Sequence, residues 1–249
     1  MNGPAPAATA WWRAFTHHPT HGALPAMLLG LTLVSGVVDA VSILSFGRVF
    51  VANMTGNVVF LGFALVGAAG FSLAATVAAL LGFLFGAFVT GIVLVRGRGR
   101  VPGQGPSRTL AERYRLLRDA VLIEAALLAV VLVVTVVADD PFGEAERVVL
   151  SAIAAVAMGV QGATARAIAV PDLPTTVLTS TMTGMVADLH AREWPALTRR
   201  VCAVLAMFAG AAVGAVAVLH ASVAASVAIA VAIVVAVGAF AAQTGRRLL

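Results

Sequence analysis

Residues 24–46 read LPAMLLGLTLVSGVVDAVSILSF, an apolar run with a single ionisable residue. A helix needs about 20 such residues to cross the hydrocarbon core of a membrane. Hydrophobic residues make up 61% of the chain and charged residues 11%, whereas a soluble domain carries about 25% charged residues. Five further runs of this kind lie at 72–95, 119–138, 148–168, 197–219 and 222–241. The predicted fold class is therefore an all-α integral membrane protein with about six transmembrane helices.

Two shorter apolar segments, 58–71 and 175–189, interrupt this pattern at matching places in the two halves of the chain. The first follows the string Asn53-Met54-Thr55-Gly56-Asn57, and the second contains Leu178-Thr179-Ser180-Thr181-Met182-Thr183-Gly184. Segments of about 14 residues indicate broken or re-entrant helices. Backbone that leaves a helix inside a bilayer must find other hydrogen-bond partners, and paired interruptions are the best sequence pointer to the binding site of a transporter.

The placement of arginine bears on the number of crossings. Basic residues number 16, all of them arginine, and seven lie within residues 96–118. Cytoplasmic loops of membrane proteins carry an excess of such residues. Re-entrant short segments would also place both termini and the arginines around residues 192–200 in the cytoplasm, whereas full crossings would place them outside. The rule favours six crossings with both termini cytoplasmic, and eight crossings is the alternative.

The order of features is the same in both halves, which predicts two pseudo-symmetric repeats. If the short segments are re-entrant, each half crosses the membrane three times, so the repeats are inverted and the breaks enter from opposite faces. The predicted divisions are a cytoplasmic tail at 1–23, a first repeat core at 24–95, an arginine-rich cytoplasmic loop at 96–118, a closing span at 119–138, an acidic external loop at 139–147, a second repeat at 148–241 and a cytoplasmic tail at 242–249.

Asp39 is the sharpest candidate site residue, because it lies deep in the first span. An ionisable group there costs roughly 2.5–3.5 kcal/mol on insertion scales and usually faces a cavity or a partner. Either it couples transport to a proton or cation, or it is a hydrogen-bonded acid that fixes helix packing. Glu124 is expected near the membrane interface instead, close to Arg118 and Asp119.

The polar residues of the broken segments form the rest of the predicted site. Hydroxyl and amide groups can coordinate a dehydrated cation or hydrogen-bond a small polar solute, and the alternative is that they only satisfy the broken backbone. These residues are Asn53, Thr55, Asn57, Thr176, Thr179 and Thr181.

Two pairs of glycines spaced four apart are predicted to serve helix packing, because small residues let helix backbones approach closely. These are Gly82 and Gly86 in the first half and Gly210 and Gly214 in the second. The chain has no metal-ligand spacing, hydrolase motif or phosphate-binding loop. We therefore expect no enzyme activity, catalytic residue, metal or cofactor, and no nucleic-acid partner.

The strings Ser35-Gly36-Val37-Val38-Asp39-Ala40 and Asn53-Met54-Thr55-Gly56-Asn57, with the later Thr175-Thr176-Val177-Leu178-Thr179, resemble the YoaK-like family of uncharacterised bacterial membrane proteins. The resemblance implies a multi-pass protein of the bacterial inner membrane and no settled activity. The function we favour from the sequence is a secondary transporter or permease for an unidentified small solute. A passive channel and a non-transporting membrane scaffold are the alternatives. The expected partners are the lipid bilayer and a small solute or ion, and a homo-oligomer is left open.

Overall fold

The computed structural model describes residues 18–96, 109–138, 141–173, 175–176 and 178–248. These residues form helices joined by short connections, and they hold no β-strand. Within these described residues, six helices are long and apolar enough to cross a membrane. They are α2 (Leu24–Ser45), α4 (Leu73–Val89, continued by the π-helix η2, Thr90–Arg96), α5 (Leu110–Val137), α6 (Glu144–Ile168), α8 (Trp194–His220) and α9 (Val223–Arg246). The all-α membrane fold predicted from the sequence is confirmed.

The helix α5 begins nine residues earlier than the predicted span at 119–138. Its start is fixed by a capping box, in which the Thr109 hydroxyl accepts from the Glu112 amide and the Glu112 carboxylate accepts from the Thr109 amide. The loop predicted at 96–118 is therefore wrong over residues 110–118, which are helical, and its residues 97–108 lie outside the described part of the chain. Hydropathy locates lipid-facing residues, whereas capping decides where a helix begins.

The bundle has two distinct ends. At one end the Tyr114 hydroxyl accepts from the Ala23 amide at 2.7 Å, so α2 and α5 begin together. At the other end the Ser151 hydroxyl donates to the Phe46 carbonyl at 3.3 Å, so α6 begins where α2 finishes. We call the end where α2 begins the Arg-rich end. The helices and turns at this end carry many arginines, among them Arg113, Arg115, Arg118, Arg192, Arg199, Arg200 and Arg246. The other we call the opposite end.

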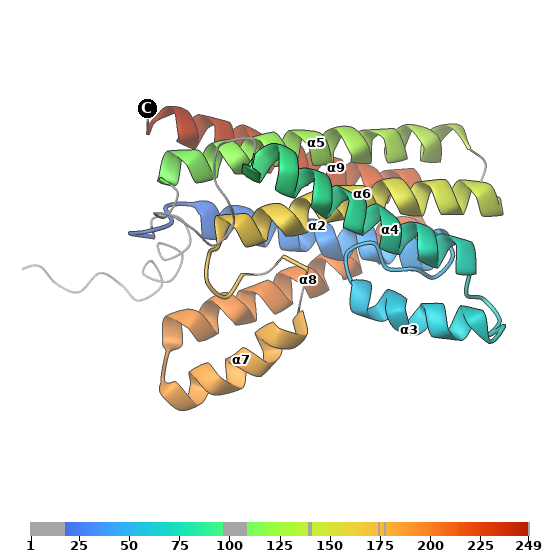
Figure 1. Cartoon of the computed structure of the whole chain (residues 1–249), viewed down its shortest axis with the longest axis horizontal. Helices are drawn as coiled ribbons and strands as arrows, with labels where there is room; N and C mark the ends of the chain where they lie inside the picture. The colour runs from blue at the N-terminus through green and yellow to red at the C-terminus, as the bar shows by residue number, and fades with distance from the viewer. Residues whose placement is uncertain (1–17, 97–108, 139–140, 174, 177, 249) are drawn as a thin grey trace, which may run out of the picture.

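Two short helices, α3 (Met54–Leu65) and α7 (Leu178–Ala191), reach only part of the way across. At 12 and 14 residues they are about 18 and 21 Å long, less than the roughly 30 Å of a hydrocarbon core. Both begin near the middle of the bundle; α3 runs toward the opposite end and α7 toward the Arg-rich end (Figure 1). The two breaks therefore enter the molecule from opposite ends.

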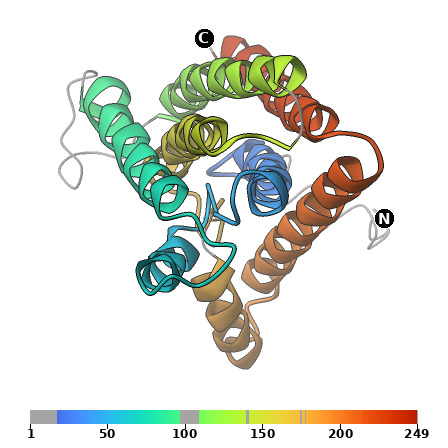
Figure 2. The same ribbon diagram turned by 90° about the vertical axis from the view of Figure 1, so that its right-hand side faces the viewer.

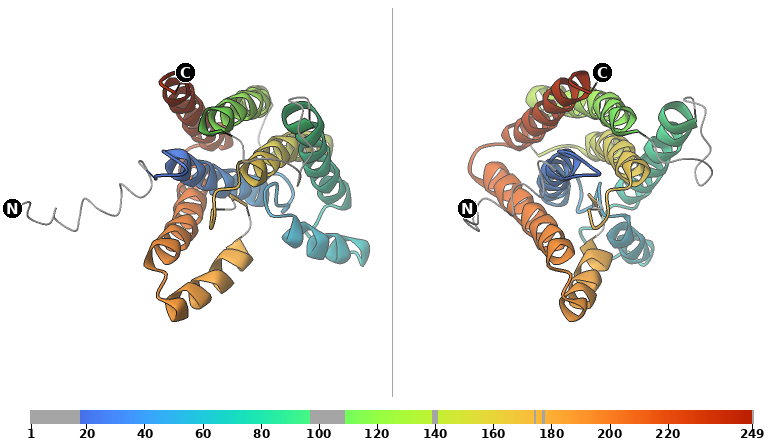
Figure 3. Two further views of the ribbon diagram at one scale, coloured as in Figure 1. Left: turned by 60° about the vertical axis from the view of Figure 1, so that its left-hand side comes forward. Right: turned by 90° about the vertical axis from the view of Figure 1, so that its left-hand side faces the viewer.

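The helices α2 and α6 form the centre of the bundle. Of the most apolar 18-residue stretch of each helix, 67% is buried inside the protein in α2 and 61% in α6. In the other four crossing helices the buried share is 22–33%. Figures 2 and 3 show them enclosed by α5 and α9 on one side and by α4, α8, α3 and α7 on the others. The closest packing is between α4 and α6, between α2 and α8, and between α5 and α9. The central helix of each half thus packs against the long helix of the other half.

The four glycines predicted to serve packing lie at these crossings. A Cβ on Gly210 would collide with the Leu33 carbonyl of α2, and a Cβ on Gly86 would collide with the Val156 carbonyl of α6. Gly214 lies against Val37 and Gly82 against Ala152 in the same way. By these contacts Gly86 corresponds to Gly210, one helical turn away from the pairing that the sequence alone suggests. The repeat remains an interpretation, and its two crossings use the same device.

Candidate functional site

Asp39 fixes the first break, which is the non-helical segment at 46–53 between α2 and α3. Its Oδ1 accepts hydrogen bonds from the amides of Val51 and Ala52, at 2.9 and 2.8 Å. The side chain is buried, and Oδ2 makes no hydrogen bond with any described residue. One carboxylate oxygen thus replaces the bonds that the backbone loses on leaving the helix, and the other remains free in the interior.

Asn57 holds the same segment from α3. Its Oδ1 accepts from the Phe50 amide at 2.8 Å and its Nδ2 donates to the Phe50 carbonyl at 2.5 Å, so the side chain pairs with both polar groups of one residue. Gly56 lies against the ring of Phe50, where a Cβ would collide. The Asn53–Asn57 string therefore has a local explanation: an amide that clamps the extended chain and a glycine that leaves room for its aromatic side chain.

The second break lies between the end of α6 at Ile168 and the start of α7 at Leu178. It begins with Ala169, whose φ of 53° is in the left-handed region. Thr175 is buried, and its hydroxyl finds no partner in the described structure. The Thr176 hydroxyl lies 3.8 Å from where a Cβ on Gly162 would be. The sequence alignment of the halves places Gly162 at the position of Asp39. The second break therefore passes α6 at Gly162, where no carboxylate is present to accept hydrogen bonds from its backbone as Asp39 does in the first break.

An ion-pair network anchors the second break at the Arg-rich end. Asp172 pairs with Arg199 at 2.8 Å and with Arg200 at 2.5 Å, and Arg200 also pairs with Asp188 at 2.7 Å. These side chains are 13–19% exposed, so solvent screens the pairs less than on an open surface. Because Asp172 lies in the break, Asp188 in α7 and both arginines in α8, the network joins three elements.

The entry to α2 lies beside this network. The Arg113 guanidinium donates to Nδ1 of His21 at 2.8 Å, which requires an unprotonated ring nitrogen there. Burial lowers the pKa of His21, and the charges of His18, Arg113 and Arg199 lower it further. His21 is therefore held neutral and serves as an acceptor between the tail and α5.

Hydrogen bonds also link the two central helices. The Gln161 Nε2 on α6 donates to the Ser35 hydroxyl on α2 at 2.8 Å, and Ser35 lies one turn from Asp39 on the same face of its helix. The Gln161 Oε1 and the Thr164 hydroxyl are buried and make no hydrogen bond within the described residues. The Gln161–Ser35 bond therefore joins the two central helices, one turn from Asp39 on α2 and next to Gly162 on α6.

Glu124 is buried inside the bundle, although the sequence predicts a position near the membrane interface. It is 0% exposed and neither carboxylate oxygen has a hydrogen-bond partner among the described residues, so the expected position near the interface is wrong. Its location follows from the early start of α5, which puts Glu124 near the middle of that helix. A pattern in the sequence indicates this burial: Glu124 lies in a row of mostly apolar residues spaced three or four apart, which face one side of a helix. The row comprises Tyr114, Leu117, Val121, Glu124, Leu128, Val131 and Thr135.

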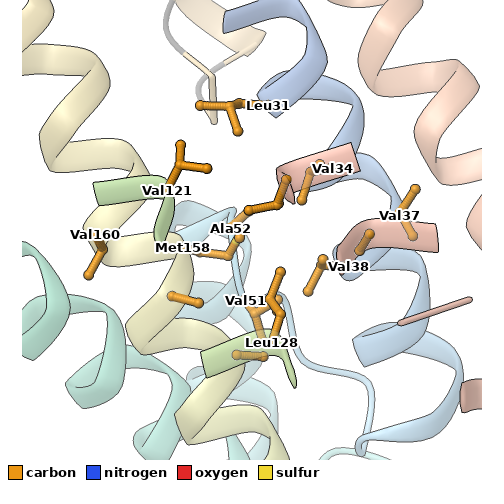
Figure 4. Packing of buried hydrophobic residues seen from close by; sticks show 14 of the residues in the cluster. Leu31, Val34, Val37, Val38, Val51, Ala52, Val121, Leu128, Met158 and Val160 are labelled. Carbon is orange, nitrogen blue, oxygen red and sulfur yellow. The ribbon is translucent and has the colours of Figure 1, made fainter. Parts of the chain in front are cut away.

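Glu124 lies close to the level of the other buried polar groups. Val121 packs against Gly238 of α9, and Gly30 of α2 packs against the neighbouring Val237. On parallel, ideal helix axes, the position three residues further along puts Glu124 at the height of Leu33. Along the axis of α2, that height is about 3 Å from Ser35 and about 9 Å from Asp39. Figure 4 shows Val121 and Leu128, one turn to either side of Glu124, in one cluster with Ala52 and Met158. We call Ser35, Asp39, Glu124, Gln161, Thr164 and Thr175 the polar layer.

The predicted site residues divide into two groups. Asp39, Asn57 and Thr181 are buried, and Asn53 and Thr176 are partly buried beside the breaks. The other two, Thr55 and Thr179, are exposed near the starts of the short helices. The structure therefore does not bring all seven residues together, and it adds Gln161, Thr164, Thr175 and Glu124, which lie outside that predicted set.

The free atoms of the polar layer are mostly acceptors. They comprise Asp39 Oδ2, both oxygens of Glu124 and Gln161 Oε1, with two hydroxyls that can donate or accept. Buried groups of this kind are costly unless something satisfies them. Nowhere in the described residues do three or more His, Cys, Asp or Glu side chains group as they would around a metal ion. The chemistry of the layer therefore suits a proton, a hard cation or a small hydrogen-bond donor.

Comparisons with known proteins agree with the membrane fold. A family model described as "Protein of unknown function (DUF1275)" matches residues 27–240. The UPF0700 transmembrane protein YoaK of Bacillus subtilis (strain 168) is 27% identical over 162 residues, which make up 65% of this chain and 65% of that relative. The chain thus aligns with just under two thirds of the relative's length. No solved structure matches. The resemblance to the YoaK-like family is confirmed.

Proposed function

Because this chain belongs to the DUF1275 family of membrane proteins of unknown function, we propose its function from its own geometry: it is a secondary transporter or permease for a small solute. The solute would bind at the polar layer, between the two breaks. The protein would be an inner-membrane protein with its Arg-rich end in the cytoplasm. The proposal involves no catalytic step, no cofactor and no resident metal centre.

One observation carries this proposal. Two broken segments enter from opposite ends and pass the centre of α2 and α6 (Figure 1), where buried polar atoms have no partner within the described residues. Irregular backbone is tolerated at membrane depth where protein or a water-filled cavity surrounds it. Transporters built on inverted repeats place their sites at such half-helices, and one repeat then rocks against the other.

The proposed roles differ between residues. Asp39 would hold the first break through Oδ1 and offer Oδ2 to the solute or a coupling ion. Asn57 would keep the extended segment in place through Phe50, with Asn53 lying beside it. Thr176 and Thr181 would contribute from the second break, where no carboxylate occupies the place of Gly162. The exposed Thr55 and Thr179, near the starts of the short helices, would act at the edge of the site.

Accessibility of Gly162 tests the transport proposal. A Cβ there would meet Phe83 at 3.4 Å and Thr176 at 3.8 Å, which is ordinary van der Waals contact, so a substituent at this position causes no clash at Cβ. In a Cys202→Ser background, Gly162→Cys should react with a membrane-impermeant thiol reagent from each side of the membrane, because alternating access opens the layer to both sides in turn. The reaction rate should fall when a transported solute is present.

The matched control is Leu122→Cys, whose position on α5 is 60% exposed on the outside of the bundle. It should resist the impermeant reagent, because a charged reagent does not enter lipid and a thiol there does not ionise readily. Equal inertness of Gly162→Cys and Leu122→Cys toward the impermeant reagent would favour a membrane scaffold over a transporter. Reaction of Gly162→Cys from both sides, at a rate that does not change when solute is added, would favour a channel.

A further inference from the structure

Asp39 and Glu124 are both buried carboxylates, but their surroundings differ. Oδ1 of Asp39 accepts from two backbone amides, which stabilise a charged carboxylate. Glu124 receives no hydrogen bond from any described residue, on either oxygen. An ionised carboxylate without partners is the costliest group that a membrane interior can hold. Glu124 is therefore stable only as a neutral acid or beside a bound cation.

The charges of the helices packed against α5 do not neutralise Glu124. On α6 they are Glu144, Glu146 and Arg147 in the first turn and the exposed Arg166 near the other end, and on α9 Arg246 lies in the last turn. On α5 itself, Arg118 pairs with Asp119 at 2.7 Å. Across the core, Asp39 of α2 is a second negative charge when ionised. Nothing in this set gives Glu124 a counter-charge.

Other members of the polar layer carry oxygen atoms of the kind that a hard cation prefers. Carboxylate, amide carbonyl and hydroxyl oxygens are the donors that such ions prefer. Gln161 Oε1, the Thr164 hydroxyl and the Thr175 hydroxyl are each at most 2% exposed and free of bonds to the described residues. The amides at the first break, which would attract an anion instead, are already bonded to Asp39.

We propose that Glu124 is the proton-exchanging group of the polar layer, which binds a small monovalent cation in place of the Glu124 proton. The O–H bond of the carboxylic acid breaks, the proton leaves to bulk water, and the cation takes its place beside the carboxylate. The charge of the layer is the same before and after the exchange. This inference rests on the proposed function, because it assigns the ion coupled to solute movement, and it moves the exchange from Asp39 to Glu124.

Proton release from the full-length protein tests this exchange. The purified protein, weakly buffered near pH 7 with a soluble pH indicator, is moved from choline chloride to sodium or potassium chloride at constant ionic strength. The wild type should release about one proton per chain, because cation binding and proton binding are linked. Glu124→Gln, which keeps the shape of the side chain and cannot ionise, should release none.

The matched control is Glu193→Gln, which changes an exposed carboxylate that makes no capping bond and should release as many protons as the wild type. A thermal unfolding curve of Glu124→Gln shows that it folds; a rise in its stability is expected, since a buried acid is removed. Equal proton release by Glu124→Gln and wild type, or no release by the wild type in either salt, would overturn the inference. Release that needs Glu124 while Gly162→Cys stays inert would keep the cation site and overturn only the transport function.

Discussion

Asp39 holds the backbone with one carboxylate oxygen and leaves the other free, so two substitutions should have different effects. Asp39→Asn keeps an oxygen that accepts from Val51 and Ala52, and the protein should remain folded with a small change in unfolding temperature. Asp39→Leu leaves both amides without an acceptor, at a cost of about 1–3 kcal/mol for each. Thermal unfolding in detergent, read with size-exclusion profiles, measures the difference.

Equal stability of Asp39→Asn and Asp39→Leu would contradict the capping role of Asp39. If both variants unfold like the wild type, the first break is held by Asn57 alone. If Asp39→Asn folds normally but alters the reactivity of Gly162→Cys, the free oxygen bears on the conformational equilibrium as well as on packing.

At the residue scale, the sequence indicates those site residues whose chemistry conflicts with their immediate surroundings. Asp39 stands out because apolar neighbours flank it, and Asn57 because it follows the break. Glu124 does not stand out, because Arg118 and Asp119 precede it and suggest an interface. Its burial depends on where α5 begins and on how α5 packs against α6 and α9. These are long-range facts that local composition does not contain.

At the scale of elements, the two glycine crossings make a specific prediction. A Cβ at Gly86 would meet the Val156 carbonyl, which is backbone and has little room to move. Gly86→Ala should therefore destabilise the protein by about 1–3 kcal/mol, as overpacking does, despite a gain of up to about 1 kcal/mol in helix propensity. The unfolding temperature of the purified protein measures the balance.

Gly62 on α3 is the matched control, because a Cβ there has no neighbour within 4 Å. Gly62→Ala should leave the unfolding temperature unchanged or raise it slightly. A loss of stability in Gly62→Ala as large as that in Gly86→Ala would show that flexibility of glycine, and not close approach of α4 to α6, matters at these positions.

The crossing helices could be predicted well because their apolar runs match the thickness of a membrane. Their ends could not, because polar first and last turns extend beyond the apolar run: α6 begins at Glu144 instead of 148, and α9 ends at Arg246 instead of 241. The short helices were expected at 58–71 and 175–189, and they lie at Met54–Leu65 and Leu178–Ala191. Backbone turns set those limits, and hydropathy does not report them.

At the scale of the whole molecule, the direction of every helix in the first half is reversed in the second (Figure 1). The same reversal places α3 at one end of the bundle and α7 at the other, and it brings the two breaks to a common level around the polar layer. The two halves interlock, since each central helix packs against the long helix of the other half and Gln161 of α6 donates to Ser35 of α2. The candidate site is therefore a property of the complete bundle.

The uneven distribution of arginine predicts how the bundle is oriented. The Arg-rich end carries most of the arginines of the described chain, whereas Arg48 and Arg147 lie at the opposite end beside the acidic first turn of α6. The positive-inside rule therefore predicts that the Arg-rich end lies in the cytoplasm. In a Cys202→Ser background, Gly143→Cys at the opposite end should react with an impermeant thiol reagent in intact cells. Glu193→Cys, in the turn between α7 and α8, should react only after the cells are permeabilised, and its labelling in intact cells would show that the bundle has the reverse orientation.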